Sequence, residues 1–253
     1  MYAHEIFTYL KSRETHYVIK DYMPNQKGIT SWMRALLVDW LVEVQENFEL
    51  NHETLYLAVK LVDMYLGKVQ VNKATLQLVG AAAMLIAAKY DERIPPIIDD
   101  FIHVCDGAYT RRDMTRMEVQ ILKTMDFNLG IPLSYRFLRR YARCAKIQMP
   151  LLTLARFILE YSLMEYPTIT LSDSKMAAAS LYLALKMKKS GSWTNTLHYF
   201  SGYKVEDFKE VAILLNSILH KPPKDLLSTV RSKYSHKIFF EVAKTPLVDD
   251  CEL

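Results

Sequence analysis

The stretch MRALLVDWLVEV, residues 33–44, constrains the fold more than any other part of the chain. Nine of its twelve side chains are apolar, and many of them recur at the three- and four-residue spacing of an α-helix. Further apolar residues, among them Val38 and Val42, occupy the opposite side. A helix that is apolar on several sides has to be covered on several sides. We therefore expect it to be the central member of a helical bundle.

One charged residue inside this helix, Arg34, needs a partner. A guanidinium that is removed from water costs several kcal/mol unless a carboxylate and further hydrogen bonds meet it. Asp63 lies in another apolar run, LVDMYL, and is the best candidate for that carboxylate. We predict a buried ion pair between Arg34 and Asp63 that ties the two helices together.

The 7 glycines and 9 prolines fall almost entirely between long runs of helical periodicity. Gly80 alone lies inside a run, where a missing side chain permits close helix packing. No stretch shows the alternation of a strand, so the predicted fold class is all-α. With 51% apolar residues, 24% charged residues, no apolar run long enough to span a membrane and no signal-peptide pattern, the sequence predicts a soluble intracellular protein.

The helical runs occur twice in the same order. Placing AAAMLIAAKY at residue 81 over AAASLYLALK at residue 177 aligns the two halves at a period of about 95 residues, which suggests a duplicated five-helix domain. Thr30 or Ser31 can cap the helix at 33–44, and Thr110 with Asp113 forms a capping pattern. The other expected helices span 2–14, 52–66, 73–90, 97–105 and 110–125, then 134–146, 150–164, 172–188, 194–200 and 204–220.

The predicted domains are an N-terminal helix and polar linker (1–28), a first helical domain (29–130), a second (131–235) and a tail (236–253). In the tail, the residues after 244 have little to bury, so we expect them to be mobile. Residues 1–130 carry 14 basic and 17 acidic side chains, a net charge of −3, and residues 131–253 carry 18 and 11, a net charge of +7. The basic half favours acidic partners or is a solvated surface. Three distant cysteines without a CxxC spacing indicate neither a disulfide framework nor a zinc site.

Several long motifs resemble the cyclin family, and within it the B-type mitotic cyclins and their third subtype. The motifs are MRALLVDWLVEV, LQLVGAAAMLIAAKYDE, TRRDMTRMEVQILKTMDFNL and the FLRR at 137–140. The resemblance covers residues 2–240. It implies a tandem cyclin fold, and a regulatory subunit that binds and activates a cyclin-dependent kinase, the mitotic kinase foremost, in nuclear control of mitosis or meiosis. Mitotic cyclins carry a destruction motif in a long N-terminal region that this chain lacks, so we expect the chain to be a fragment or short form.

The resemblance assigns a kinase-binding set. Lys89 donates and Glu118 accepts hydrogen bonds at the kinase backbone near its C-helix, and apolar side chains form a platform around them. The alternative for the two charges is a solvated helix end and an internal salt bridge, and for the platform it is membership of the core, most of all for Ile86. Tyr90 stands where the family has Phe. The remaining members of the set are Leu122, Phe127, Leu129, Ile6 and Tyr9.

The resemblance also assigns a substrate-docking groove along one stripe of the helix at 33–44. Glu43 receives the arginine of an Arg-x-Leu peptide, and an apolar floor receives its leucine. Periodicity alone favours the alternative that the apolar members are core residues. The set comprises Met33, Leu36, Trp40, Glu43, Leu76 and Gln77. No sequence pattern for a nucleophile, a phosphate loop, a cofactor or a metal is present, so we expect the chemistry to take place on the partner kinase.

A group of arginines in the second half is a candidate phosphate-binding site, because several guanidiniums can capture a phosphate and B-type cyclins suggest docking of a phosphorylated regulator. The alternatives are a solvated basic face and pairing of Arg139 or Arg140 with Glu160 or Glu165. The group consists of Arg139, Arg140, Arg143 and Arg156. The competing function for the whole chain is a nucleic-acid-binding transcription factor with two cyclin folds, although nucleic acid is the less favoured partner.

Overall fold

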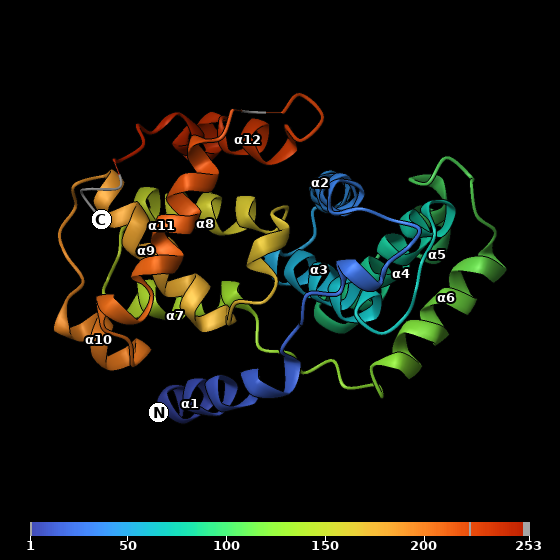
Figure 1. Cartoon of the computed structure of the whole chain (residues 1–253), viewed down its shortest axis with the longest axis horizontal. Helices are drawn as coiled ribbons and strands as arrows, with labels where there is room; N and C mark the ends of the chain where they lie inside the picture. The colour runs from blue at the N-terminus through green and yellow to red at the C-terminus, as the bar shows by residue number, and fades with distance from the viewer. Residues whose placement is uncertain (1, 223, 250–253) are drawn as a thin grey trace. The chain divides into compact units, whose positions relative to one another are not determined.

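The computed structural model describes residues 2–222 and 224–249, and every regular element in them is helical (Figure 1). The only extended pairing within this part of the chain is one isolated bridge between Gly28 and Asn72. The prediction of an all-α fold is confirmed. The chain forms two compact units, residues 17–131 and residues 1–16 together with 132–253, which we call the first and second domains. The predicted N-terminal segment 1–28 is thus divided between them.

The first domain contains five α-helices, of which the fourth is short. Thr30 caps the first of them by accepting a hydrogen bond from the Met33 amide at 3.3 Å, and Thr110 forms a capping box with Asp113 at the last, so both predicted caps are present. The helices are α2 (Ser31–Asn47), α3 (His52–Leu66), α4 (Lys73–Asp91), the short α5 (Ile98–His103) and α6 (Arg111–Thr124).

Helix α4, and not α2, is the centre of the first domain, so the predicted central position of the helix at 33–44 was wrong. Helix α4 contacts α2, α3, α5 and α6, and nearly every residue from Leu76 to Ala88 is buried. Its alanines and Gly80 are the physical reason, because small side chains let neighbouring helices approach from all sides. A Cβ atom on Gly80 would lie 2.7 Å from Leu37 Cδ1 of α2, which confirms the close approach predicted at this glycine.

The linker before α2 packs against the first domain and is not a simple polar turn. Tyr17, Ile19 and Tyr22 are buried, and the Gln26 side chain is clamped between backbone groups. Its Nε2 donates to the carbonyls of Leu66 and Val69 at 2.6 Å each, and its Oε1 accepts from the Val71 amide at 3.0 Å. One glutamine thereby closes the turn that follows α3.

The second domain repeats the helix order of the first, as the sequence period predicted. Helix α9 takes the central place, contacts α7, α8 and α11, and buries an alanine-rich run like that of α4. The predicted helix 204–220 is interrupted at Phe208 (φ −134°), which separates a 3-10 turn, Val205–Asp207, from α11. The helices are α7 (Ser134–Cys144), α8 (Met149–Ser162), α9 (Asp173–Met187), the short α10 (Asn195–Ser201) and α11 (Lys209–His220).

Helix α1 (Ala3–Arg13) packs within the second domain, and the 3-10 turn Glu14–Tyr17 follows it, with Tyr17 already in the first domain. Glu14 accepts hydrogen bonds from the amide and the hydroxyl of Ser174, each at 2.6 Å, at the start of α9. Burial raises the pKa of the Glu14 carboxyl, and the Ser174 bonds oppose this rise. The carboxylate therefore caps α9 from another segment of the chain.

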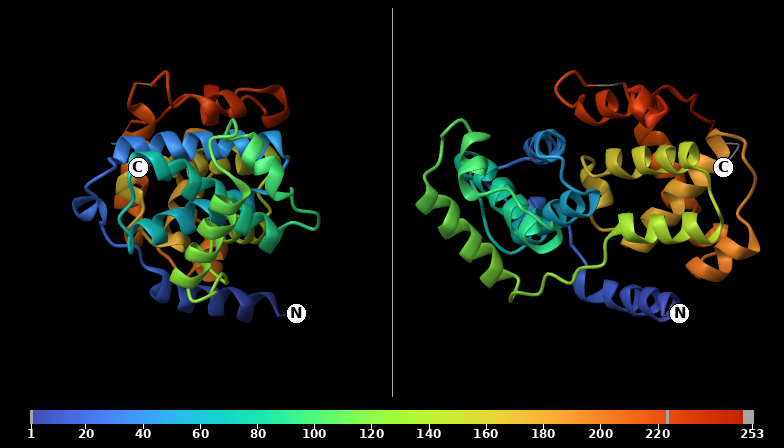
Figure 2. Two further views of the ribbon diagram at one scale, coloured as in Figure 1. Left: turned by 90° about the vertical axis from the view of Figure 1, so that its right-hand side faces the viewer. Right: turned by 180° about the vertical axis from the view of Figure 1, so that it is seen from behind.

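The C-terminal residues of the second domain contain a helix that the sequence did not indicate, α12 (Thr229–Tyr234), which packs on α8 (Figure 2). The expectation that residues after 244 bury little holds for Pro246, Leu247 and Asp249, which are exposed, but not for Val248. Val248 is 6% exposed, and its carbonyl accepts a hydrogen bond from Asn216 at 2.8 Å. Residues 250–253 of the predicted tail lie outside the described residues.

Candidate functional site

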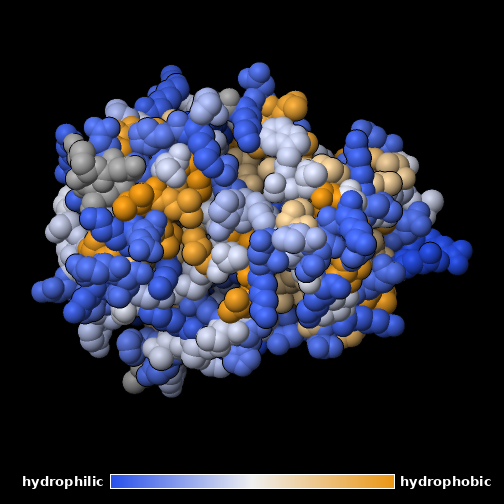
Figure 3. All heavy atoms as spheres, in the orientation of Figure 1, coloured by the Kyte–Doolittle hydropathy of each residue, from blue (hydrophilic) through white to orange (hydrophobic). Residues whose placement is uncertain are grey.

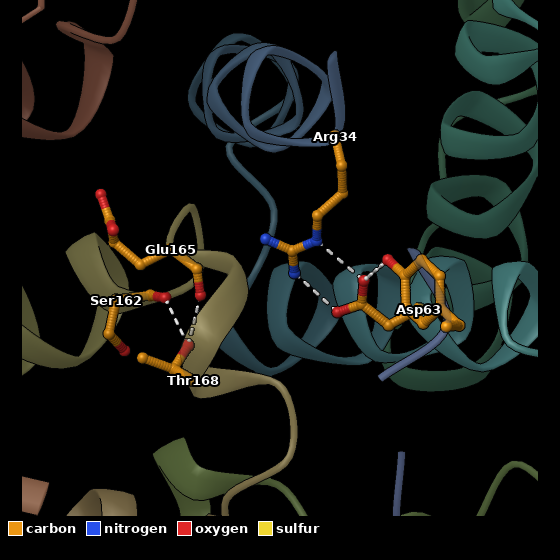
Figure 4. A network of polar contacts seen from close by, with 6 residues as sticks. Arg34, Asp63, Ser162, Glu165 and Thr168 are labelled. Carbon is orange, nitrogen blue, oxygen red and sulfur yellow. Dashed lines mark hydrogen bonds and ion pairs between the residues drawn. The ribbon is translucent and has the colours of Figure 1, made fainter. Parts of the chain in front are cut away.

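The predicted ion pair between Arg34 and Asp63 is present at the core of the first domain (Figure 4). Arg34 Nε and Nη2 donate to Asp63 Oδ1 and Oδ2 at 2.8 and 2.6 Å, so the contact is bidentate. Tyr22 Oη donates to Asp63 Oδ1 at 2.7 Å, a contact that the sequence did not reveal. Burial by itself lowers the pKa of Arg34, but the carboxylate of Asp63 raises it, and the net change is upward. The pair is structural and keeps α2 on α3.

A second buried pair with the same chemistry lies in the second domain. Lys233 Nζ on α12 contacts Glu160 Oε1 on α8 at 2.6 Å, and both side chains are 1% exposed. Tyr234 Oη donates to the other carboxylate oxygen at 2.8 Å. The sequence signal for this pair is the same as for Arg34, because Glu160 is also a charge inside an apolar helical run, ARFILEYS. Just beyond α8, the Thr168 hydroxyl lies 2.9 and 2.7 Å from the carbonyls of Ser162 and Glu165 (Figure 4).

Lys89 and Glu118, the charges assigned to a kinase interface, meet at the surface of the first domain. Lys89 Nζ at the end of α4 lies 2.6 Å from Glu118 Oε1 in the middle of α6. The lysine side chain is 48% exposed and the glutamate side chain 15% exposed. The internal salt bridge considered for these residues is therefore present in the chain by itself, and the ammonium remains accessible from solvent.

The apolar platform around this pair is only partly exposed. Tyr90 and Phe127 are 50% and 65% exposed, whereas Leu122 and Leu129 are half-buried. Ile86 is 2% exposed, so its predicted place on the exposed platform was wrong. The reason is that α4 has neighbours on all sides, which cover its apolar residues up to Ala88. In the view of Figure 3 the surface is mostly hydrophilic, with apolar atoms in separate patches.

The backbone after α6 turns Phe127 outward. Asp126 and Phe127 have φ values of 49° and 55°, in the left-handed region that costs a non-glycine residue roughly 1–2 kcal/mol. Tyr17 Oη donates to Asn128 Oδ1 at 2.7 Å and holds the segment in place. The Tyr90 hydroxyl is near Gly130, because a Cβ atom added to that glycine would lie 4.0 Å from the hydroxyl oxygen. Tyr90 therefore lies beside Gly130, in the segment that follows Phe127.

Ile6 and Tyr9, the other residues assigned to the kinase-binding set, lie on the exposed face of α1 in the second domain. They are 52% and 56% exposed. The Tyr9 hydroxyl accepts a hydrogen bond from Arg13 Nη1 at 2.8 Å, one helical turn away. The side of α1 that packs on its own domain is instead represented by Phe7, which contacts Phe137 of α7 edge to face.

The residues of α2 assigned to substrate docking are partly exposed to solvent. Met33, Leu36 and Trp40 on α2 are half-buried, and Glu43 is exposed. They are not the fully buried core residues that periodicity alone favoured. On α4, Gln77 is half-buried but Leu76 is 5% exposed, so the predicted exposure of Leu76 in a groove was wrong. Its burial has the same cause as that of Ile86, because it too lies on the central helix.

The four arginines of the candidate phosphate site separate into three places. Arg139 and Arg156 lie 5.8 and 6.0 Å from the ring centroid of Tyr135, so both guanidiniums are neighbours of the same ring. Arg140 instead contacts the rings of Phe7 and Phe200, while Arg143 is exposed on α7. The acids considered as alternative partners are bound by other cations, Glu160 by Lys233 and Glu165 by Lys221 at 3.0 Å.

No candidate metal centre or membrane span occurs in the described ranges. No group of three or more potential metal-ligating side chains occurs there, and no helix found there is long and apolar enough to cross a membrane. Cys105 and Cys144 are free thiols, and burial raises the pKa of Cys105 to about 11 and also raises that of Cys144. Cys251 lies outside the described residues.

Comparison with known proteins matches both domains. The model of the cyclin N-terminal domain matches residues 5–130, and that of the cyclin C-terminal domain matches residues 132–247. The chain is 58% identical to the G2/mitotic-specific cyclin-B3 of Drosophila melanogaster and 54% identical to that of Gallus gallus, in both cases over 100% of this chain. It spans 45% and 62% of the lengths of those relatives.

Among solved structures, a viral cyclin from herpesvirus saimiri superposes with a TM-score of 0.74 at 24% identity, over 90% of this chain and 99% of the viral one. At that level of identity the likeness concerns the fold. It agrees with two consecutive helical domains of matching helix order.

Proposed function

Because this chain belongs to the cyclin family, we propose that it is a regulatory subunit that binds and activates a cyclin-dependent kinase in mitotic or meiotic control. The observation that carries the proposal is the surface formed by Lys89, Glu118, Tyr90 and Phe127, where an accessible ion pair lies beside exposed apolar side chains. Interface hot spots combine these features, a few desolvated polar contacts within an apolar cluster.

The ion pair can be exchanged for contacts with a partner at little cost. A partly exposed salt bridge contributes roughly 0–1 kcal/mol. Hydrogen bonds from charged groups to a partner's backbone contribute about 1.5–3 kcal/mol each. Opening the contact between Lys89 and Glu118 so that each bonds to the kinase is therefore favourable. The pair keeps both side chains extended and correctly placed before the kinase arrives.

The proposed mechanism is allosteric. The rigid surface of α4 and α6 displaces the C-helix of the kinase inward, which completes the kinase's own Lys–Glu ion pair for positioning ATP phosphates. Exposed Ile6 and Tyr9 on α1 provide a further contact. We assign no chemical step to this chain, and the phosphoryl transfer takes place on the kinase.

The test mixes the purified chain with monomeric cyclin-dependent kinases and measures histone phosphorylation and calorimetric affinity. Lys89→Met and Glu118→Gln are each expected to weaken binding about tenfold or more, from the loss of a charge-assisted hydrogen bond. Arg111→Gln is the matched control, because Arg111 forms an exposed salt bridge with Asp99 at 2.8 Å on the same domain. Equal affinity of all variants for every kinase, at unchanged melting temperature, would remove the pair from the interface.

Substrate recruitment is a second part of the proposal and rests on the half-buried stripe of α2. Docking of an Arg-x-Leu segment there raises the effective concentration of the attached phosphoacceptor without affecting the transition state. Met33→Ala combined with Trp40→Ala should therefore reduce turnover of long Arg-x-Leu substrates and spare a short peptide. Equal losses on both substrates would show that the stripe is structural.

The pair Arg139 and Arg156 supports a further proposal, that a phosphorylated segment of a regulator docks on the second domain. Both guanidiniums lie within about 6 Å of the Tyr135 ring, and we propose that they converge on one phosphate. A phosphoserine peptide should bind the parent with a stoichiometry of one, and Arg139→Ala with Arg156→Ala should abolish this binding. Binding of the unphosphorylated twin with equal affinity would count against the site.

The competing function is nucleic-acid binding by the basic second half. Association that falls steeply with salt and needs no kinase would favour it over kinase regulation. We also propose that the protein acts in the nucleus, and imaging of the tagged chain in dividing cells would test this.

A further inference from the structure

A groove of about 420 Å³ lies within the second domain between α1 and the helices α7 and α10. This volume is in the range of roughly 300–1,000 Å³ that is usual for small-ligand pockets. The groove has aromatic walls and a cationic polar part, and none of the described residues contributes a carboxylate to its lining. Its aromatic and cationic side chains include Phe7, Tyr199, Phe200, Lys11 and Arg140.

Arg140 is the central cation of this groove. Its guanidinium lies 5.5 Å from the ring centroid of Phe7 on α1 and 5.0 Å from that of Phe200 on α10, so it bridges the two walls. The side chain is half-buried, and the described part of the chain offers it neither a hydrogen bond nor an ion pair. A guanidinium has five N–H donors and stays charged in proteins. Its donors therefore remain available to a ligand in the groove.

Lys11 supplies a second positive charge. Its Nζ donates to the Ser201 carbonyl at 2.7 Å and lies 3.6 Å from the centroid of the Tyr203 ring. Burial lowers the pKa of this lysine, which means that its charged form is poorly solvated. An anion bound nearby would compensate for that lost solvation. At the outer end of the groove, the imidazole of His4 stacks on Tyr199 at 6.0 Å between ring centroids.

We propose that this groove binds an aryl phosphate, in the form of a phosphotyrosine side chain of a partner peptide. The phosphate would be held by Arg140 with support from Lys11, and the aryl ring would pack against the aromatic walls. A phosphate monoester carries a charge of about −1.5 to −2 near neutral pH and three strong acceptor oxygens. Its charge matches the two cations that line the groove, and its acceptors match the unused donors of Arg140. Glu14 and Asp207 lie outside the lining, and their charges act on Lys11.

The aromatic walls distinguish this ligand from other phosphates. Phosphoserine or inorganic phosphate would use the two cations but would leave the rings uncovered. The exposed Tyr199, at 68%, is the wall residue most open to an incoming ring. The site differs from the one proposed at Arg139 and Arg156, because those side chains lie against Tyr135, which is absent from the lining of the groove.

The test titrates phenyl phosphate, inorganic phosphate and phenol into the full chain and follows the methyl and aromatic NMR signals. It uses Arg139→Gln/Arg156→Gln as the background, which removes the other candidate phosphate site. Phenyl phosphate is expected to bind with one equivalent and to shift the signals of Phe7, Tyr199 and Phe200. We expect phenol and inorganic phosphate each to bind about tenfold more weakly or worse, since each lacks one of the two recognition elements.

Arg140→Gln in this background should weaken phenyl phosphate binding about tenfold or more, whereas Arg143→Gln, an exposed arginine on the same helix, should not. Arg140 also contacts Phe7 of α1 and Phe200 of α10, so the melting temperature of the variant is measured to show that the fold is unchanged. Tyr199→Ala, at a more exposed position, serves as a second probe and should weaken phenyl phosphate but not inorganic phosphate.

Equal weakening by Arg140→Gln and Arg143→Gln would show diffuse attraction and overturn the proposal. Phenol or inorganic phosphate binding as tightly as phenyl phosphate would also overturn it. In a matched pair of peptides, phosphotyrosine should bind more tightly than phosphoserine. Preference for phosphoserine, or tighter binding of a nucleoside monophosphate, would refute the assigned ligand.

Discussion

Replacement of Asp63 by Asn tests the energetics of the first domain most directly. Asparagine keeps the shape of the side chain but leaves the Arg34 guanidinium, which is 1% exposed, without its counter-charge. Arginine does not lose its proton in proteins, so the variant cannot escape by neutralising the cation. Breaking a buried pair from one side costs about 3–5 kcal/mol. We expect Asp63→Asn to lose that amount of unfolding free energy.

Two further variants separate the parts of this network. Tyr22→Phe removes one hydrogen bond to Asp63 but leaves the ion pair, so it should cost about 1.5–3 kcal/mol at most, the scale of a bond to a charged group. Replacing both partners, as Arg34→Met with Asp63→Leu, removes both buried charges. Such exchanges are often neutral or stabilising, so the double variant should be more stable than Asp63→Asn.

The assay has to resolve the first domain from the second, because a chain of two domains need not unfold in one step. Two of the three tryptophans, Trp32 and Trp40, belong to the first domain. In a Trp193→Phe background, fluorescence during urea or heat denaturation therefore reports on that domain. A loss of 3 kcal/mol or more should lower its midpoint by about 12 °C or more, at roughly 4 °C per kcal/mol. A change of less than about 2 °C, or a double variant as unstable as Asp63→Asn, would refute the reasoning.

Three other predictions follow from single features of the structure. Glu160→Gln should lower the unfolding free energy of the second domain, measured in urea, by about 3–5 kcal/mol, because it removes the counter-charge of the buried Lys233 ammonium. Gly28→Ala should cost about 1–3 kcal/mol, since its Cβ would lie 2.8 Å from a backbone oxygen, while Gly67→Ala, with a nearest contact of 3.3 Å, should cost less. In a variant without the third cysteine, a thiol reagent at pH 8 should modify Cys144 before Cys105, because a pKa of about 11 leaves Cys105 roughly one part in a thousand as thiolate.

The sequence was sufficient for the helices and for one buried pair because both depend on local spacing and on a general energetic rule. The ends of α3 and α4 were predicted to within one residue, since capping residues and glycines mark them. The Arg34–Asp63 contact followed from the cost of burying a charge alone. The period of about 95 residues was enough to predict that α9 repeats α4.

What could not be predicted depends on which side of an apolar helix is covered. Leu76 and Ile86 were placed on exposed surfaces, and the helix at 33–44 was placed at the centre, because periodicity gives spacing but not the number of neighbours. Helix α12 was missed because only two of its six residues, Val230 and Tyr234, are apolar. Arg139 and Arg140 separate because consecutive residues of a helix do not face the same side. The contact of Arg140 with Phe7 depends on where α1 docks, which no local pattern in either segment encodes.

Two of the residues assigned to kinase binding, Tyr90 and Phe127, are aromatic side chains that the fold leaves largely exposed. Phe127 is 65% exposed and follows Asp126 in the left-handed region, so the chain accepts unfavourable backbone geometry at the very point where it leaves an aromatic ring in water. Tyr90 is exposed directly after a run of α4 that is buried from Leu78 to Ala88. Packing of the first domain leaves half or more of each ring exposed to solvent. Local costs of this kind persist when the surrounding structure fixes them, as Tyr17 does at Asn128, and they are typical of binding surfaces. The rigid core of α4 and α6 thus carries the exposed aromatic side chains at the helix ends, and a partner that covers them would recover the hydrophobic free energy that folding alone leaves unused.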